Sequence, residues 1–186
     1  MNIFVLDRDP KLAAQMHCDK HVVKMILESA QLLATAHRMI DGELYEGRTK
    51  TGRKVKRWEL HDEREVYLYQ ATHINHPCTV WARESEENYK WLLSLFKELC
   101  KEYTHRYGKI HSCEKFMRLL EIIPENMKKV ERTEFPQAMP DDCKDNDSIR
   151  AYRNYYIMYK KDFAKWKNRD VPSWFVDKVS YANVSV

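Results

Sequence analysis

Glycine and proline are scarce in this chain, which has 4 Gly and 6 Pro among 186 residues. So few turn-forming residues leave little room for the many tight turns of an all-β fold. No apolar run approaches the length of a membrane-spanning helix, and the N-terminus lacks the pattern of a signal peptide. We therefore expect a cytoplasmic protein with no membrane partner.

Cysteine pairing motifs are absent as well. The 5 Cys are an odd number and include no CxxC pair, which indicates free thiols in a reducing compartment. The chain also has no glycine-rich phosphate loop, GxSxG elbow or dinucleotide-binding fingerprint, and this excludes the common nucleotide-dependent classes of enzyme. The formal net charge of +4 is too small to identify a partner by itself.

The residues that are abundant predict a fold that is mainly α, a compact single-domain helical bundle over residues 1–186. Hydrophobic residues make up 44% of the chain and charged residues 32%, as in soluble globular proteins with a substantial core. Asp9 and Pro10 form a helix start, and Asp41 with Gly42 a helix end. The patterns predict a short extended N-terminus, an irregular loop over about 122–146, and helices over about 11–40, 79–107, 112–120 and 148–167.

Polar residues of mixed chemistry form one stripe along the first predicted helix. Steps of three or four residues place them on one face, while the other faces of the helix are apolar. Two imidazoles, an amine, a carboxylate and an amide on one rigid element favour acid–base chemistry. The competing interpretation is a solvated stripe on a mostly buried helix. The stripe consists of His17, His21, Lys24, Glu28, Gln31 and Thr35.

An amine beside a carboxylate is the combination that we favour for the chemistry. Lys20 and Lys24 lie next to Glu28 on the helix, and the α-amine of Met1 is expected nearby. An amine can attack a sugar C1′ and form a Schiff base, while a carboxylate stabilises the cationic sugar or moves protons. Such chemistry requires the target base to leave the DNA stack. The predicted catalytic residues are Glu28, Lys24, His21, His17 and Met1.

Basic residues are concentrated in an insert over about 43–58, which is predicted to be a small hairpin or loop. Within it, the stretch from residue 48 to residue 57 contains no acidic residue, and an aromatic residue follows. A solvated loop would explain such a run, but a basic hairpin beside an aromatic ring can also contact phosphates and stack on bases. The predicted contacts to double-stranded DNA are Arg48, Lys50, Arg53, Lys54, Lys56, Arg57 and Trp58.

A second polar cluster and the C-terminal tail are predicted to line the substrate pocket. The cluster lies around the motif THINHP, ahead of the helix expected from about residue 79. Its histidines are placed to close a pocket over the target base, although His76 before Pro77 equally suits a turn that hydrogen-bonds its own backbone. The predicted substrate-binding residues are His73, Asn75, His76, Arg83 and Trp174.

Two other chemistries remain open from the residues alone. A zinc or iron site could form from the imidazoles and a thiol of both clusters, namely His17, His21, His73, His76 and Cys78. The HxxxH spacing without the glutamate of metalloproteases is a weak signal, and we expect no metal and no cofactor. The other alternative is a nucleophilic pair of Cys18 with one of the first two histidines, although only Lys20 is near enough in sequence to activate the thiol.

Several short motifs occur in an order that is typical of a known family. The opening MNIFVLDRDPKLAA has a short apolar N-terminus and a Pro-Lys-Leu helix start, KMILESAQLL follows in the first helix, and the tail reads VPSWFVDKVSYA. In these motifs the chain resembles the pyrimidine-dimer DNA glycosylase family of phages and bacteria, the endonuclease V type. From HCDKH through THINHP and QAMPD to the PxWF tail, it also resembles a group of phage proteins that carry this family's name.

The resemblance implies a compact, mostly helical protein that kinks duplex DNA at a cyclobutane pyrimidine dimer. The family cuts the glycosidic bond with an N-terminal amine, nicks the strand as a lyase and uses no metal. Glu28 takes the place of the family's catalytic acid, and Trp174 stands among tail aromatics that lie near the substrate. Leu27 replaces the Arg that precedes the acid, with Lys24 as the nearest cation. A phage protein of this kind would work in the host cytoplasm.

One departure from the family concerns the amine. The family exposes it by removing the initiator Met from an accepting second residue, whereas Asn2 is a poor substrate for that removal. Either the Met1 amine itself serves, or Lys24 substitutes for it, or the glycosylase chemistry is absent. The basic insert and the two histidine clusters also go beyond the family pattern.

We therefore expect a DNA-processing enzyme that acts on a pyrimidine base in duplex DNA, as a glycosylase with abasic-site lyase chemistry. One alternative is a transferase that modifies a thymine or cytosine derivative in phage DNA. Another is a non-catalytic DNA-binding or host-interaction protein whose polar stripe is structural. A metal-dependent hydrolase is the last alternative.

Overall fold

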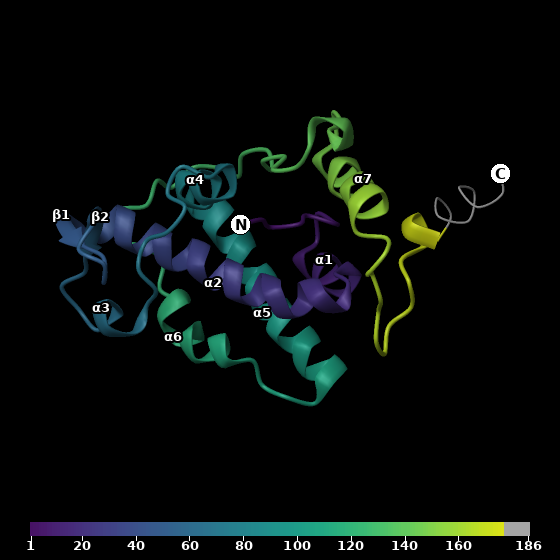
Figure 1. Cartoon of the computed structure of the whole chain (residues 1–186), viewed down its shortest axis with the longest axis horizontal. Helices are drawn as coiled ribbons and strands as arrows, with labels where there is room; N and C mark the ends of the chain where they lie inside the picture. The colour runs from purple at the N-terminus through teal and green to yellow at the C-terminus, as the bar shows by residue number, and fades with distance from the viewer. Residues whose placement is uncertain (177–186) are drawn as a thin grey trace.

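The computed structural model describes residues 1–176, and these residues are mainly α-helical, as expected (Figure 1). The described part of the chain also holds a sheet of two antiparallel strands. In chain order the elements are α1 (Pro10–Met16), α2 (Asp19–Asp41), β1 (Glu43–Arg48), β2 (Lys54–Glu59), α3 (Arg64–Tyr67), α4 (Pro77–Glu84), α5 (Glu86–Tyr107), the 3₁₀ helix η1 (Ser112–Phe116), α6 (Met117–Leu120), the 3₁₀ helix η2 (Asp141–Cys143) and α7 (Ser148–Tyr159).

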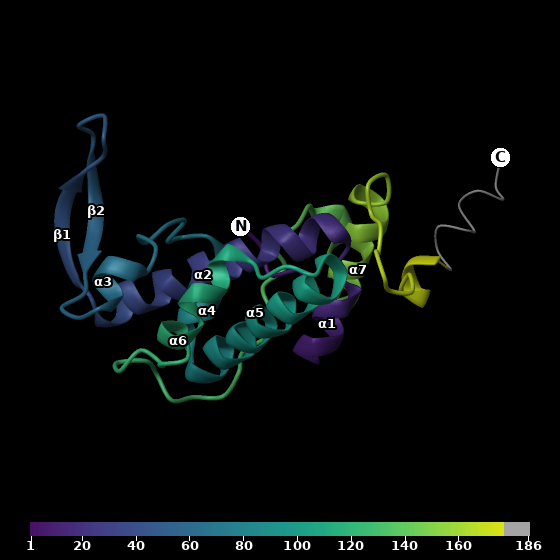
Figure 2. The same ribbon diagram turned by 90° about the horizontal axis from the view of Figure 1, so that it is seen from below.

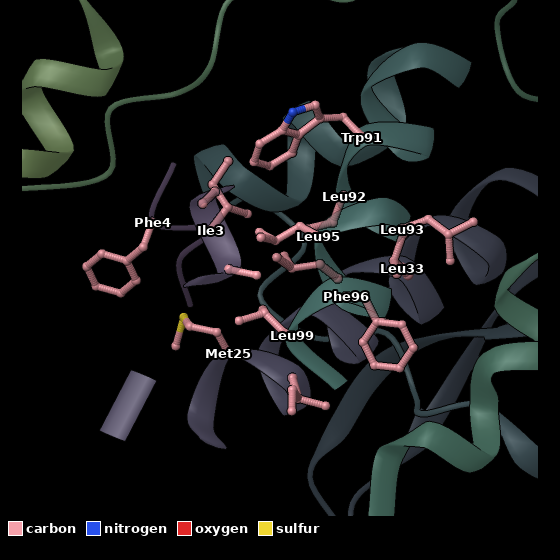
Figure 3. Close-up of a cluster of buried hydrophobic side chains, with 14 of the residues drawn as sticks. Ile3, Phe4, Met25, Leu33, Trp91, Leu92, Leu93, Leu95, Phe96 and Leu99 are labelled. Atoms are coloured by element: carbon pink, nitrogen blue, oxygen red, sulfur yellow. The ribbon is translucent and has the colours of Figure 1, made fainter. Parts of the chain in front are cut away.

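The hydrophobic core forms where α2 packs against α5, and the N-terminal segment is part of it. Ile3, Val5 and Leu6 are fully buried, so the first six residues are built into the body of the protein. This insertion holds the chain next to Met1 in place, because exposing each buried apolar side chain to water costs free energy. Figure 3 shows side chains of this cluster, among them Ile3, Met25, Leu33, Leu92, Phe96 and Leu99.

The first helix is interrupted, which corrects the prediction of one helix over about 11–40. Asp9 caps α1 as expected, since its carboxylate accepts a hydrogen bond of 2.8 Å from the backbone of Lys11. However, α1 ends at Met16, and α2 begins at Asp19 after two extended residues. The backbone N–H of Asp19 donates to the carbonyl of Lys165 at 2.8 Å, and its carboxylate pairs with Arg106. Asp19 thus contacts α5 and the segment after α7 at this break. Local periodicity gives no sign of such distant contacts.

Two further helix boundaries differ from the predictions. The helix expected over about 79–107 is two helices, because Ser85 is extended and caps α5 by accepting a hydrogen bond from the backbone of Asn88. The helix expected over about 148–167 starts as predicted but stops at Tyr159. The chain then turns so that the buried indole of Trp166 donates to the carbonyl of Met16 at 2.9 Å. Tertiary packing decides both of these ends.

The basic insert is a hairpin, the first of the two forms that were expected. Strands β1 and β2 pair from Glu43 opposite Glu59 to Arg48 opposite Lys54. The hairpin stands out from the body beside the end of α2 (Figure 2). Its base approaches α2 closely at Gly42, where a Cβ atom would lie 2.3 Å from the carbonyl oxygen of Arg38. Only glycine allows the strand to leave the helix at this point.

The chain beyond α6 is largely irregular until α7, as expected for about 122–146. Phe135 is nevertheless buried, with its ring 4.7 Å from that of Trp91, so this loop lies on the body. Residues 177–186, the end of the tail motif, lie outside the described residues. No helix within residues 1–176 is long and apolar enough to cross a membrane.

Candidate active site

A buried carboxylate lies near the middle of α2. Oε2 of Glu28 accepts a hydrogen bond of 2.8 Å from the backbone N–H of Asn2. The amino nitrogen of Met1 lies 3.8 Å from the same oxygen, and Nζ of Lys24 lies 3.4 Å from Oε1. The structure thus brings together three of the predicted catalytic residues, with two amines flanking one carboxylate.

The two amines differ in how they meet solvent. The side chain of Met1 is only 3% exposed, yet the residue as a whole is partly exposed, so the exposed part is its main chain. The side chain of Lys24 is 65% exposed and reaches Glu28 from the surface of α2. The amine of Met1 is therefore held beside Glu28 by packing, while that of Lys24 is at the end of a flexible side chain.

The N-terminal segment is held by Asn2 and Phe4. Oδ1 of Asn2 accepts hydrogen bonds from the backbones of Ile3 and Phe4, and its Nδ2 donates to the carbonyl of Ala138 at 2.8 Å. Phe4 has a φ of 39°, in the left-handed region that is strained for a bulky side chain. Its ring stacks on His21 at 4.2 Å between centroids. These contacts aim the first residue at Glu28.

The segment before α4 brings the second histidine cluster to the same carboxylate. His76 caps α4, since its Nδ1 accepts a hydrogen bond from the backbone of Cys78. Burial lowers the pKa of His76, the N-terminal amine and His73 lower it further, and Glu28 partly opposes them. His76 therefore lies within the electrostatic range of the amine and the carboxylate, and His73 lies within that of His76. The exposed Asn75 lies between the two histidines in the chain.

The first pair of histidines is buried beside this site rather than exposed in it. Nδ1 of His21 lies 2.5 Å from the hydroxyl of Tyr156, and burial lowers the pKa of His21 to about 3. His17 ends α1 and so does not lie on the stripe of α2, which corrects the predicted alignment. Its Nδ1 donates to the carbonyl of Ala13, and burial lowers its pKa to about 4. Both imidazoles are neutral at neutral pH.

The predicted phosphate contacts lie apart from Glu28, on the hairpin. Arg48, Lys50, Arg53, Lys54 and Lys56 are exposed, and Arg57 is partly buried. Trp58 is different, because it is only 9% exposed and packs at the hairpin base, where Arg38 donates to its carbonyl. Its ring is therefore not presented for stacking on a base, contrary to what the sequence suggested.

Comparison of the sequence with protein-family models finds a match. The model described as pyrimidine dimer DNA glycosylase matches residues 1–115, which is more than half of the chain. The chain belongs to this family. No curated protein matches it, and no solved structure does.

Membership of the pyrimidine dimer DNA glycosylase family makes DNA the substrate. The matched residues run from the N-terminal segment through α5 into η1. They therefore contain Met1, Glu28, both histidine clusters and the hairpin, whereas α7 and the tail lie beyond the match.

Within residues 1–176, no hydrogen bond or ion pair joins Arg83 or Trp174, also predicted to bind substrate, to Glu28 and its two amines. Arg83 is on the last turn of α4, where its buried Nη1 has no hydrogen-bond partner among residues 1–176. Trp174 packs against Tyr156 at 6.0 Å and under the guanidinium of Arg153 at 5.5 Å. Among the described residues, Trp174 is linked to the site through Tyr156 and His21.

The thiols and histidines do not form the alternative sites within the described residues. Burial raises the pKa of the Cys18 thiol and raises that of Cys78 to about 12, so both favour the unreactive thiol form. In residues 1–176, no group of three His, Cys, Asp or Glu side chains lies close enough together to hold a metal ion. The predicted pairing of Cys18 with a histidine gains no support from its environment.

Asn2, Phe4 and Ala138 contribute to the site but were not predicted from the sequence. The signal for Asn2 was local, since Asn side chains commonly accept hydrogen bonds from the backbone two residues on. Nothing comparable marks Ala138, which takes part through its carbonyl oxygen alone. The aromatic contact between Phe4 and His21 likewise depends on the tertiary fold.

Proposed function

We propose that this glycosylase removes a pyrimidine base from duplex DNA and then cuts the strand at the resulting abasic site. The amine of Met1 is the nucleophile, and Glu28 is the assisting carboxylate. The observation that carries the proposal is the 3.8 Å separation of these two groups in a member of a DNA glycosylase family. An amine and a carboxylate so close together can act on the same sugar carbon.

The first step replaces one bond at the deoxyribose C1′ by another. The amine lone pair forms a bond to C1′, the bond from C1′ to the base nitrogen breaks, and the base leaves with the electron pair and takes up a proton. Glu28 offsets the positive charge that develops on the sugar. The nitrogen then loses a proton, the C1′–O4′ bond breaks, and O4′ takes up a proton, which leaves an imine between the enzyme and C1′.

The second step cuts the strand. A proton leaves C2′, the bond from C3′ to its phosphate oxygen breaks, and the phosphate departs with the electron pair. Water then hydrolyses the imine and restores the free amine. Glu28 is the titratable group beside the amine that can accept and return protons in these steps.

Met1 is a better nucleophile than Lys24 on geometric grounds. The N-terminal segment is buried and hydrogen-bonded from Asn2 onward, so its amine is already oriented when DNA arrives. Lys24 is mostly exposed and must lose side-chain freedom to reach a sugar beside Glu28. Lys24 remains the runner-up, because its Nζ is 3.4 Å from the same carboxylate.

The buried histidines position groups in this proposal. A proton donor at neutral pH needs a pKa near 7, whereas the pKa of His21 is about 3 and that of His17 about 4. His21 supports the ring of Phe4 and thereby the N-terminal turn. His76 lies within the electrostatic range of the amine, and we place His76 and its neighbour His73 at the rim where a base that has left the stack would enter.

Reduction with borohydride tests the proposal, because it converts the imine into a stable bond between protein and DNA. The full-length protein is mixed with an abasic-site duplex and reduced, and the adduct is separated by size. We expect an adduct with the wild type and at least a hundredfold slower adduct formation with Glu28→Gln. Lys20→Gln is the matched control, because Lys20 is exposed on the same helix and lies over the ring of Phe163.

The outcomes separate the proposal from its rivals. If the wild type forms no adduct, the lyase chemistry is absent, and the result favours the transferase or the non-catalytic alternative. If Glu28→Gln forms adduct as fast as the wild type, the carboxylate has no catalytic part. If Lys20→Gln is as slow as Glu28→Gln, the loss reflects general damage to DNA binding.

A further inference from the structure

The hairpin is rooted rigidly at the end of the helix that carries Glu28. The guanidinium of Arg38 is fully buried, and it donates to the carbonyl of Trp58 in β2 at 2.9 Å. The same guanidinium pairs with Glu65 and donates to the carbonyls of Leu68 and Tyr69. Because α2 joins Arg38 to Glu28 as one helix, the hairpin base has a fixed position relative to the site.

Charge along the hairpin rises from its base to its tip. Glu43 and Glu59 face each other at the base, whereas Arg48 and Lys54 face each other next to the turn. Lys54 is neutralised in part by an ion pair of 2.8 Å with Glu46. Within residues 1–176, Lys50, Arg53 and Lys56 form no ion pair, so the far end of the arm presents uncompensated positive charge.

The distance from Glu28 to the hairpin base can be expressed in base pairs of duplex DNA. Ten residues of α-helix between Glu28 and Arg38 correspond to about 15 Å, and strands of six residues extend about 20 Å further. At 3.4 Å per base pair, the offset along α2 equals roughly four or five base pairs of duplex. The arm itself is longer than either groove is deep, which is about 8 Å.

The hairpin and the site also open to the same side. Figure 2 shows the hairpin projecting from the edge of the body at which the N-terminus lies. Lys24 beside Glu28 is exposed as well, and so are His73 and Asn75 in the segment that leads to His76. A duplex seated on the amine and running along α2 would therefore pass the hairpin on one side of the target base only.

We infer that the hairpin is a one-sided arm that binds duplex DNA about four or five base pairs from the reacting nucleotide. This rests on the proposed function only in that DNA occupies the site beside Glu28. Uncompensated cations that release counterions from phosphates supply the affinity, so contact requires duplex on the hairpin side. The arm makes the enzyme sensitive to how much DNA lies on one flank of the lesion and insensitive to the other flank.

The test measures binding to duplexes that carry one tetrahydrofuran site, a stable analogue of an abasic site. One duplex has flanks of about 15 base pairs on both sides, and the other two are shortened to about 3 base pairs on the 5′ or the 3′ side, less than the arm's offset. Each is titrated with the wild type, with Lys50→Gln/Arg53→Gln, and with the control Lys128→Gln/Lys129→Gln. The control lysines are exposed and lie in the loop after α6.

We expect one of the two shortened duplexes, and only one, to bind the wild type about tenfold more weakly. The hairpin variant should bind the long duplex about tenfold more weakly, with a salt slope lower by about 2, and should lose nothing further on that shortened duplex. The control variant should keep the wild-type preference. Equal binding of the two shortened duplexes by the wild type, or an equal loss on all three duplexes with the hairpin variant, would overturn the inference.

The stable analogue keeps this test independent of the chemistry. No imine forms on tetrahydrofuran, so a wild type without lyase activity can still show the one-sided flank requirement. Conversely, an active enzyme with no flank preference would leave the proposed reaction intact and remove the arm. Melting temperature checks that the hairpin variant folds, since both substituted side chains are exposed at the turn.

Discussion

Glu28 and Glu102 are both buried carboxylates on long helices, but their partners differ. Both oxygens of Glu102 accept hydrogen bonds from guanidinium groups, with Arg106 at 2.7 Å and Arg169 at 2.8 to 3.2 Å. Glu28 accepts one backbone hydrogen bond, and its amine neighbours stand 3.4 and 3.8 Å away. One carboxylate is saturated by fixed donors, while the other keeps room for a reacting group.

The contrast separates a structural ion pair from a reactive one. Burial raises the pKa of Glu102, but the hydrogen bonds from Arg169 and Arg106 outweigh it and hold the pKa below its usual value. Those bonds join α5 to the C-terminal segment and through Arg106 to Asp19 of α2. Guanidinium groups cannot serve as nucleophiles because they stay protonated, whereas amines can. Partner chemistry therefore distinguishes the two sites better than burial does.

The largest effect is expected at Glu28. Glu28→Gln should slow strand cleavage at a pyrimidine dimer by about 10² to 10⁴-fold, because the carboxylate no longer offsets charge or moves protons. The amide oxygen can still accept the hydrogen bond from Asn2, so the melting temperature should change little. Single-turnover cleavage of an ultraviolet-irradiated duplex gives the rate. If Glu28→Gln were fully active, Glu28 would be a structural carboxylate like Glu102.

Glu102→Gln should produce the opposite pattern. Removing this buried charge leaves Arg106 paired with Asp19 alone and takes the carboxylate partner from Arg169, which should cost about 3–5 kcal/mol of unfolding free energy. Cleavage per folded molecule should stay within a few-fold of the wild type, since Glu102 does not contact the site. Urea unfolding and cleavage at a temperature where the variant is folded measure the two quantities. Loss of cleavage without loss of stability would assign Glu102 a functional part.

Stability should fall as the pH is lowered from about 6.5 toward 4.5. Burial lowers the pKa of His17 and His37 to about 4 and that of His21 to about 3. The unfolded chain therefore binds more protons than the native protein in this range, and each such histidine contributes up to about 1.4 kcal/mol per pH unit. Melting curves across the range measure the slope. His17→Asn should reduce it by one proton, and an unchanged slope would show that His17 titrates normally.

A smaller effect is expected at Asn2. Asn2→Asp keeps the oxygen that accepts hydrogen bonds from the backbones of Ile3 and Phe4. It replaces the amide that donates to Ala138 with a carboxylate oxygen, which then faces the carbonyl oxygen of Ala138. We expect about tenfold slower cleavage from a misplaced amine and a loss of about 1 kcal/mol in stability. Asn168→Asp is a matched control, since Asn168 is exposed in the segment after α7. Equal losses in both variants would argue against a specific role for the N-terminal turn.

The parts of the fold that follow from the sequence are those set by neighbouring residues. Asp9 and Asp147 cap their helices by accepting hydrogen bonds from backbone N–H groups two or three residues further on, so the local sequence alone locates those ends. The break before Asp19 depends on Arg106 and on the carbonyl of Lys165, which are far away in the chain. Ser85 was an intermediate case, because its cap to Asn88 is local but lies inside a continuous apolar pattern.

The candidate site divides in the same way. Helical spacing puts Lys24 beside Glu28, and the apolar opening of the chain suggested that Met1 would be drawn into the body. Spacing could not show that His17 precedes the break, or that Trp58 packs at the hairpin base. It also could not reveal the hydrogen bond between Asn2 and Ala138, because main-chain acceptors carry no sequence signal.

Locating the nitrogen that bonds to the sugar tests the central claim most directly. The borohydride-reduced adduct with an abasic-site duplex is digested with nuclease and protease, and mass spectrometry identifies the peptide that carries the sugar remnant. We predict the remnant on the α-amine of Met1, whose nitrogen lies 3.8 Å from Glu28. A remnant on Lys24 or on any other side chain would contradict the account.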